Sequence, residues 1–254
     1  ALAWVAGDVA ARLGGREREG WSRPLAVAGF AVFGLLGSPA LMFNSGFTNF
    51  FMGVTVVVVI AYLGARSLRS ARVLGWFLVP LAVLAVIGLW TPLALGLVPT
   101  GVVVAVALVR YRVWIGLAWI VASASGGLIL ALTQTSAILG VEPGQSSADF
   151  TTDLGSITAG MIPFNLGVAL LAPLIAALVA ALLIRRGSWT LAVGLVGPVL
   201  GAAMIAAVFA QGADAAGISR LESYYVLKPL YAMLIAVVPV IVAVVAVGLA
   251  RALH

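Results

Sequence analysis

The feature that most constrains this chain is a series of apolar stretches, each about 20 residues long, separated by short segments that carry arginine. A helix of that length, rising about 1.5 Å per residue, crosses the hydrocarbon core of a bilayer, which is about 30 Å thick. Only 9% of the residues are charged, against about 25% in soluble domains. The sequence therefore predicts an all-α, polytopic membrane helix bundle with about eight transmembrane helices. The expected spans are 25–43, 49–65, 73–90, 92–109, 113–133, 164–184, 189–210 and 227–250.

The distribution of basic residues predicts how these helices are oriented. Every second connection between expected spans is rich in arginine, and 12 of the 14 Lys and Arg residues fall on that side. Cytoplasmic connections carry an excess of basic residues. We therefore expect both termini on the cytoplasmic side of a bacterial plasma membrane. The net charge of +6 then reflects membrane topology, and no nucleic-acid partner is expected.

Residues 1–24 and 25–254 are expected to differ in role. Segment 1–24 is interpreted as a basic cytoplasmic segment, and its first residues resemble the tail of a helix already under way. Because the chain starts at Ala1 rather than Met, we expect it to be part of a longer protein. Residues 25–254 form the expected transmembrane bundle, with outward loops near 134–163 and 211–226. These two loops hold five of the eight acidic residues, so chemistry is expected on the outward face.

The segment from Arg220 to Met233 is the main candidate for a ligand site. The two outward basic residues, Arg220 and Lys228, both lie in it. One interpretation starts the last helix near Pro229, where proline is tolerated, so that free N–H groups next to Lys228 would favour an anion such as phosphate. The alternatives are a helix that continues through Pro229, and a lysine and tyrosines that simply occupy the membrane interface.

Other side chains complete the candidate set. Tyr224 and Tyr225 offer hydroxyl donors beside Lys228, and Glu222 is a weak candidate for an acid/base group or a counter-ion. Asp149 and Asp153 are four residues apart, so on a helix they would share a face and could bind a divalent cation or act as acid and base. Solvated loop acids are the competing interpretation. The chain has no cysteine and one histidine, His254, so thiolate and histidine metal clusters are excluded and no confident metal site is predicted.

Glycines within the expected spans are interpreted as packing positions. Gly194 and Gly197 lie in one apolar stretch, and small residues let membrane helices approach closely. The centres of several spans carry no ionisable residue, which argues against a proton- or cation-coupled transporter.

Two short segments resemble a known family. The run from Glu222 to Lys228 (ESYYVLK) contains a Tyr-Tyr-x-x-Lys pattern, and Ser38–Gly53 (SPALMFNSGFTNFFMG) is similar to a mid-protein stretch of the same enzymes. These are actinobacterial glycosyltransferases of the GT-C type, arabinofuranosyltransferase-like, which use polyprenyl-phosphate sugars. The resemblance covers about a fifth of the chain and implies an outward-facing active site, a polyprenyl-phosphate sugar donor and a cell-envelope glycan acceptor. It also implies that Lys228, Tyr224 and Tyr225 lie near the donor phosphate.

The chain departs from that family at one important point. GT-C enzymes carry a catalytic Asp or Glu in the first outward loop, whereas the corresponding loop here, Asn44–Thr48 (NSGFT), has no acid. Either the catalytic half lies in an upstream part of the same protein, or the chain does not belong to this family. A second chain that carries the chemistry is a further expected partner. A non-catalytic scaffold subunit and a lipid or solute transporter or flippase are the alternative functions.

Overall fold

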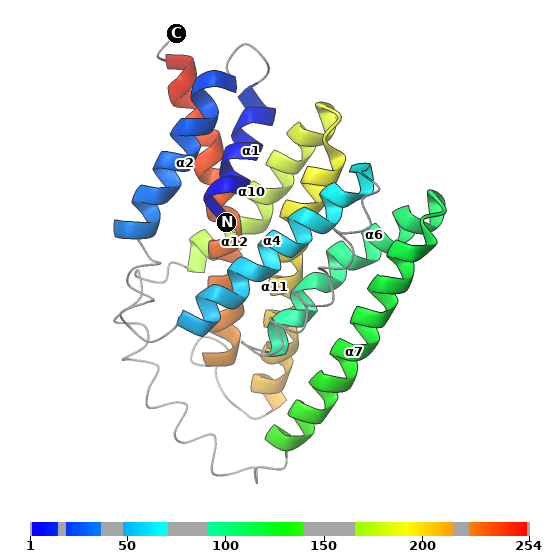
Figure 1. Cartoon of the computed structure of the whole chain (residues 1–254). Coiled ribbons are helices and arrows are strands. Elements are labelled where there is room, and N and C mark those ends of the chain that lie inside the picture. Colours follow the sequence, from blue (N-terminus) through cyan, green and yellow to red (C-terminus); the bar gives the residue numbers. More distant parts are fainter. Residues whose placement is uncertain are drawn as a thin grey trace.

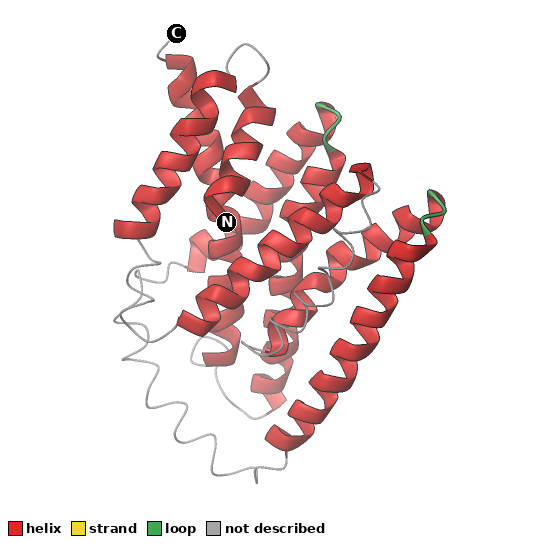
Figure 2. Ribbon diagram, in the orientation of Figure 1, coloured by secondary structure: helices red, strands yellow, loops and turns green. Residues whose placement is uncertain are grey.

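The computed structural model describes residues 2–14, 19–36, 48–70, 91–139, 166–215 and 224–252. All the regular elements in this part of the chain are helices, which confirms the predicted all-α class (Figure 2). The helices are α1 (Leu2–Gly14), α2 (Glu19–Leu36), α4 (Thr48–Ser70), the 3-10 helix η2 (Thr91–Leu97), α6 (Val98–Arg110), α7 (Trp114–Leu139), α10 (Leu166–Arg185), α11 (Trp189–Ala215) and α12 (Tyr224–Ala252).

Seven of the eight expected spans overlap these helices. Residues 37–43 of the first span and the whole of span 73–90 lie outside the described residues. In the described part of the chain, three helical segments are long and apolar enough to cross a bilayer. They are Leu93–Arg110, Trp189–Gln211 and Lys228–Ala252. The chain is therefore a membrane protein by the length and composition of its helices.

Helices α11 and α12 form the centre of the bundle (Figure 1). Helix α12 packs against α1, α2 and α10, while α11 packs against α4, η2 and α6. The two central helices are 27 and 29 residues long and apolar around their whole circumference, as expected of helices that face other helices on most sides. Helix α7 lies at the edge of the bundle, next to α6.

The N-terminal segment is part of this core. Residues 2–14 form α1, in which Val5, Ala6, Val9 and Ala10 are fully buried. Helix α2 begins at Glu19, six residues before the expected span, and runs through Pro24. Proline within the first turns of a helix removes few intrahelical hydrogen bonds, because the first N–H groups have no helical acceptor.

Three glycines of α11 let neighbouring elements touch its backbone. A Cβ atom on Gly194 would lie 2.9 Å from Cα of Tyr62 in α4, and one on Gly197 would lie 1.7 Å from Oγ1 of Thr100 in α6. A Cβ on Gly201 would lie 2.3 Å from the carbonyl oxygen of Gly96 in η2. The prediction that Gly194 and Gly197 are packing positions is confirmed.

The helix ends that carry arginine gather at one end of the bundle, which we call the arginine end. Helices α1, α4, α6, α10 and α12 end there, and α2, α7 and α11 begin there (Figure 1). The arginines in these terminal segments are Arg12, Arg23, Arg66, Arg69, Arg110, Arg112, Arg185, Arg186 and Arg251. We call the opposite end, where α4 and α12 begin, the lysine end because it carries Lys228.

Both tight turns at the arginine end have the same backbone geometry. In the α10–α11 turn, the N–H of Ser188 donates to the carbonyl of Leu183 (2.8 Å) and Gly187 has a φ of 69°. In the α6–α7 turn, Val113 donates to Leu108 (2.9 Å), and Arg112 has a φ of 58°. Both are Schellman motifs. Glycine adopts this left-handed conformation freely, whereas Arg112 adopts it at a cost of about 1 kcal/mol.

Candidate functional site

Lys228 lies in the second turn of α12, at the lysine end. The helix begins at Tyr224 and contains Pro229, so the expected helix start near Pro229 is wrong and the alternative of a continuous helix is correct. The pyrrolidine ring is accommodated because Pro229 is only five residues from the helix start, where a single intrahelical N–H bond is lost. The N–H groups without helical partners therefore lie a turn before Lys228, beside the tyrosine pair.

The ammonium group of Lys228 lies against an aromatic ring from another helix. Its Nζ is 5.2 Å from the centre of the Phe50 ring, in the first turn of α4. Phe50 is 2% exposed, and Lys228 is half-buried. An aromatic face attracts a cation. This contact therefore holds the ammonium group of Lys228 in place at the lysine end, opposite the arginines.

The remaining predicted site residues divide into two groups. Tyr224 and Tyr225 open α12, within one turn of Lys228. Arg220, Glu222, Asp149 and Asp153 lie outside the described residues. The structure therefore places Lys228 and the backbone of both tyrosines at one helix end. The expected roles of the other four residues stay predictions.

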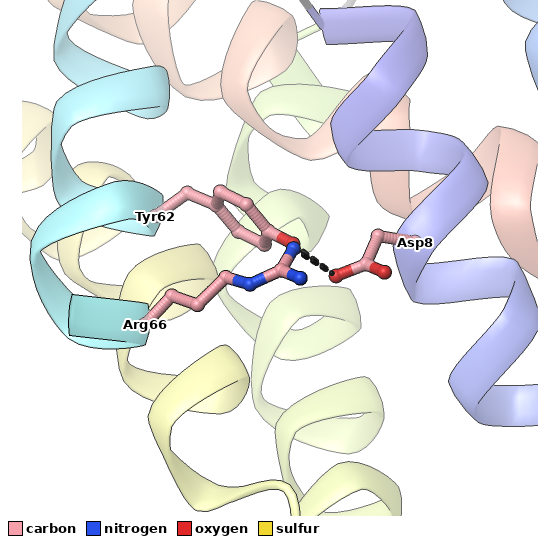
Figure 3. A network of polar contacts seen from close by, with 3 residues as sticks. All are labelled: Asp8, Tyr62 and Arg66. Carbon is pink, nitrogen blue, oxygen red and sulfur yellow. Dashed lines mark hydrogen bonds and ion pairs between the residues drawn. The ribbon is translucent and has the colours of Figure 1, made fainter. Parts of the chain in front are cut away.

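A polar cluster at the arginine end was not predicted from the sequence (Figure 3). Asp8 of α1 faces Tyr62 and Arg66, which are one turn apart on α4. Nη1 of Arg66 is 3.1 Å from Oδ2 of Asp8 and 3.0 Å from the hydroxyl oxygen of Tyr62, and the Tyr62 hydroxyl donates to the same Oδ2 atom. We call these three residues the Asp8 clasp.

Burial and aromatic contacts surround the Asp8 clasp. The Asp8 side chain is 14% exposed and that of Arg66 is 47% exposed, while Tyr62 is almost fully buried. Trp4 packs edge-on against Tyr62, with ring centres 5.2 Å apart, and the Arg66 guanidinium lies 5.4 Å from the centre of the Trp4 ring. The clasp holds α1 against α4 through a neutralised charge pair.

Sequence reasoning missed this cluster because its two halves are 54 residues apart. The available signal was local. Tyr62 and Arg66 are four residues apart, so they share a helix face, and Asp8 interrupts the apolar segment Leu2–Leu13. A carboxylate in such a segment needs a cationic or hydrogen-bonding partner.

No group of three or more metal-binding side chains occurs in the part of the chain that the structure describes. The carboxylates with described backbone are Asp8, Glu19 and Asp214. The expected divalent cation, which rests on Asp149 and Asp153, stays a prediction.

Comparison with protein-family models, with curated proteins and with solved structures gives no match for this chain.

Proposed function

We propose that the chain crosses a bacterial plasma membrane about eight times, with the arginine end in the cytoplasm. The clustering of arginine at one end of the bundle supports this orientation through the positive-inside rule. Exposed aromatic side chains at the same end, those of Trp21, Tyr111 and Trp114, match the belt that forms where a membrane meets water. The end of α12 would then be cytoplasmic and Lys228 would face outward, whereas α1 would run from within the bundle to the cytoplasmic end.

The absence of cysteine from the chain makes this orientation simple to test. We expect Gln211→Cys, at the lysine end, to react with a membrane-impermeant maleimide added to intact spheroplasts. Arg112→Cys, in the α6–α7 turn, should react only after the membrane is permeabilised. Both positions are exposed, and the cysteine-free parent controls for background labelling. The reverse pattern, or labelling of both positions from outside, contradicts the proposed topology.

We further propose that the chain is the membrane portion of a glycosyltransferase that takes a sugar from a polyprenyl-phosphate donor. The observation that supports this best is the contact between Phe50 and Lys228. These two residues belong to the two segments in which the chain resembles GT-C enzymes, and they are far apart in the sequence. Their contact brings the described end of one segment, Thr48–Gly53, next to Lys228 of the other.

The proposed reaction requires an anion site and a base. The acceptor hydroxyl would attack the anomeric carbon of the donor sugar, the bond between that carbon and the phosphate oxygen would break, and polyprenyl phosphate would leave. Lys228 would stabilise the negative charge of the leaving phosphate, aided by Arg220 and the hydroxyls of Tyr224 and Tyr225. The hydroxyl proton would pass to a carboxylate, for which Glu222, Asp149 and Asp153 are the candidates within this chain.

The substitution Lys228→Ala tests this proposal. We expect it to lower the rate of sugar transfer from a polyprenyl-phosphoryl-arabinose donor at least ten-fold, because about 1.4 kcal/mol of transition-state stabilisation corresponds to that factor. Lys228→Arg should keep more of the activity, since it retains the charge. Arg251→Ala, at the opposite end, is the matched control for loss of one cation. Unchanged transfer by correctly folded Lys228→Ala protein would contradict the role of Lys228.

A further inference from the structure

We propose that the arginine end contains a binding site for the headgroup of an anionic phospholipid. The site is the corner where α1, α4 and the α10–α11 turn meet, and we call it the α1 corner. Its cationic residues are Arg12, Arg66, Arg185 and Arg186. This inference does not depend on the proposed glycosyltransferase activity.

Two contacts place Arg66 and Arg186 on either side of the last turns of α1, which carry Arg12, and Arg185 precedes Arg186 at the end of α10. Nη1 of Arg186 is 3.2 Å from the main-chain carbonyl oxygen of Arg12, near the end of α1. One turn earlier on α1, Asp8 holds Arg66 of α4 at 3.1 Å. Asp8 and Arg12 are four residues apart and so share a face of α1. The last two turns of α1 are therefore flanked by guanidinium groups from two other elements.

Among the residues that the structure describes, the charge of the α1 corner is balanced only in part. Within the described residues, Arg66 is the member of this set that forms an ion pair. Arg12, Arg185 and Arg186 are exposed. The hydrogen bonds of Arg66 and Arg186 in the described part of the chain run through Nη1, and a guanidinium carries five N–H donors in all. The remaining donors suit the paired oxygens of a phosphate.

A ridge of exposed leucines leads along α10 to this corner. Leu171, Leu174, Leu178 and Leu182 are between 48% and 59% exposed, and their spacing places them on one helix face that continues to Arg185. An acyl chain can lie along such a ridge while its headgroup reaches the arginines. A free phosphate ion has no apolar part that could contact these leucines. The arrangement therefore favours a lipid over a soluble anion.

The depth of the α1 corner also fits a headgroup. Trp21, near the start of α2, is 59% exposed, and Trp4, which lies against Arg66, is 39% exposed. Tryptophan side chains concentrate at the level of lipid headgroups. Basic pockets between membrane helices on the cytoplasmic side are a known mode of anionic-lipid recognition.

The experiment compares two double variants of the full chain purified in a neutral detergent. Arg185→Ala/Arg186→Ala removes two charges from the α1 corner and leaves the Asp8 clasp intact. Arg110→Ala/Arg112→Gly removes two charges from the α6–α7 turn at the same end, and glycine fits the positive φ of Arg112. Binding of phosphatidylglycerol, phosphatidylcholine and inorganic phosphate is measured by native mass spectrometry and by the shift in Tm.

We expect wild-type protein and the Arg110→Ala/Arg112→Gly variant to bind phosphatidylglycerol equally and to gain Tm with it. The Arg185→Ala/Arg186→Ala variant should bind it at least ten-fold more weakly, since each arginine near a membrane contributes about a five-fold factor. Phosphatidylcholine and inorganic phosphate should give no stabilisation. An equal loss in both variants would show non-specific surface charge and overturn the site. Equal stabilisation by inorganic phosphate would overturn the assignment to a lipid.

Discussion

The substitution Gly201→Ala should destabilise the bundle by about 3 kcal/mol, because overpacking a close contact typically costs about 1–3 kcal/mol and here the obstacle is backbone. The added Cβ would lie 2.3 to 2.6 Å from the carbonyl oxygen, Cα and carbonyl carbon of Gly96. None of these atoms can turn aside as a flexible side chain would. Helix α11 and η2 would have to separate, and the contacts of α11 with α4 and α6 would loosen with them.

Unfolding in SDS, starting from protein in mild detergent, measures this loss. Gly101→Ala in α6 and Gly248→Ala in α12 are matched controls, because a Cβ at either position meets nothing within 4 Å. Both controls should leave stability unchanged or raise it by up to about 1 kcal/mol, since alanine favours a helix over glycine. A Gly201→Ala protein as stable as these controls would contradict the close approach of α11 and η2.

The second large effect is expected at the Asp8 clasp. Asp8→Ala should cost about 2 kcal/mol, because hydrogen bonds to charged groups contribute about 1.5–3 kcal/mol and the half-exposed Arg66 can recover part of its loss from water. The buried Tyr62 hydroxyl would lose the carboxylate to which it donates. Tyr62→Phe removes that bond and the one that the hydroxyl accepts from Arg66, keeps the Asp8–Arg66 ion pair, and should cost about 1 kcal/mol.

A double-mutant cycle of Asp8→Ala with Arg66→Ala separates the ion pair from the other contacts of each residue. The double variant should be more stable than the sum of the single losses predicts, by about 1 kcal/mol. Arg23→Ala, which removes an exposed arginine of α2, controls for general charge loss. Strict additivity of the two substitutions would show that Asp8 and Arg66 do not interact.

The sequence predicts the helices well. In lipid the backbone must satisfy its hydrogen bonds internally, and an apolar stretch of about 20 residues does this as a helix. It also predicts that α11 packs closely through Gly194 and Gly197. Helices α2 and α12 begin before the expected spans. The basic segment 1–24 was expected to lie outside the bundle, and proline is disfavoured inside a helix, which favoured a start near Pro229. Pro24 and Pro229 are tolerated because each lies near the start of its helix. The position of that start depends on whether the residues before the proline are helical.

Contacts between distant residues were harder to predict. Asp8 was assigned to a basic cytoplasmic segment because the charges around it dominate residues 1–24. Its partners Tyr62 and Arg66 become apparent only once α1 lies against α4. The position of Lys228 at the end of the bundle opposite the arginine end was predicted, but its aromatic partner was not, since nothing in the local sequence identifies Phe50 among ten phenylalanines.

The central position of α11 and α12 bears on how the protein is made. A ribosome delivers α1 to α10 to the membrane before it reaches the two helices against which they pack. Until then α1 and α2 lack α12, and α4, η2 and α6 lack α11. Helix α1 can pack on α2, and α6 on α4 and α7, before α11 and α12 are made. The contacts at the centre of the bundle form only when the residues from Trp189 onward reach the membrane.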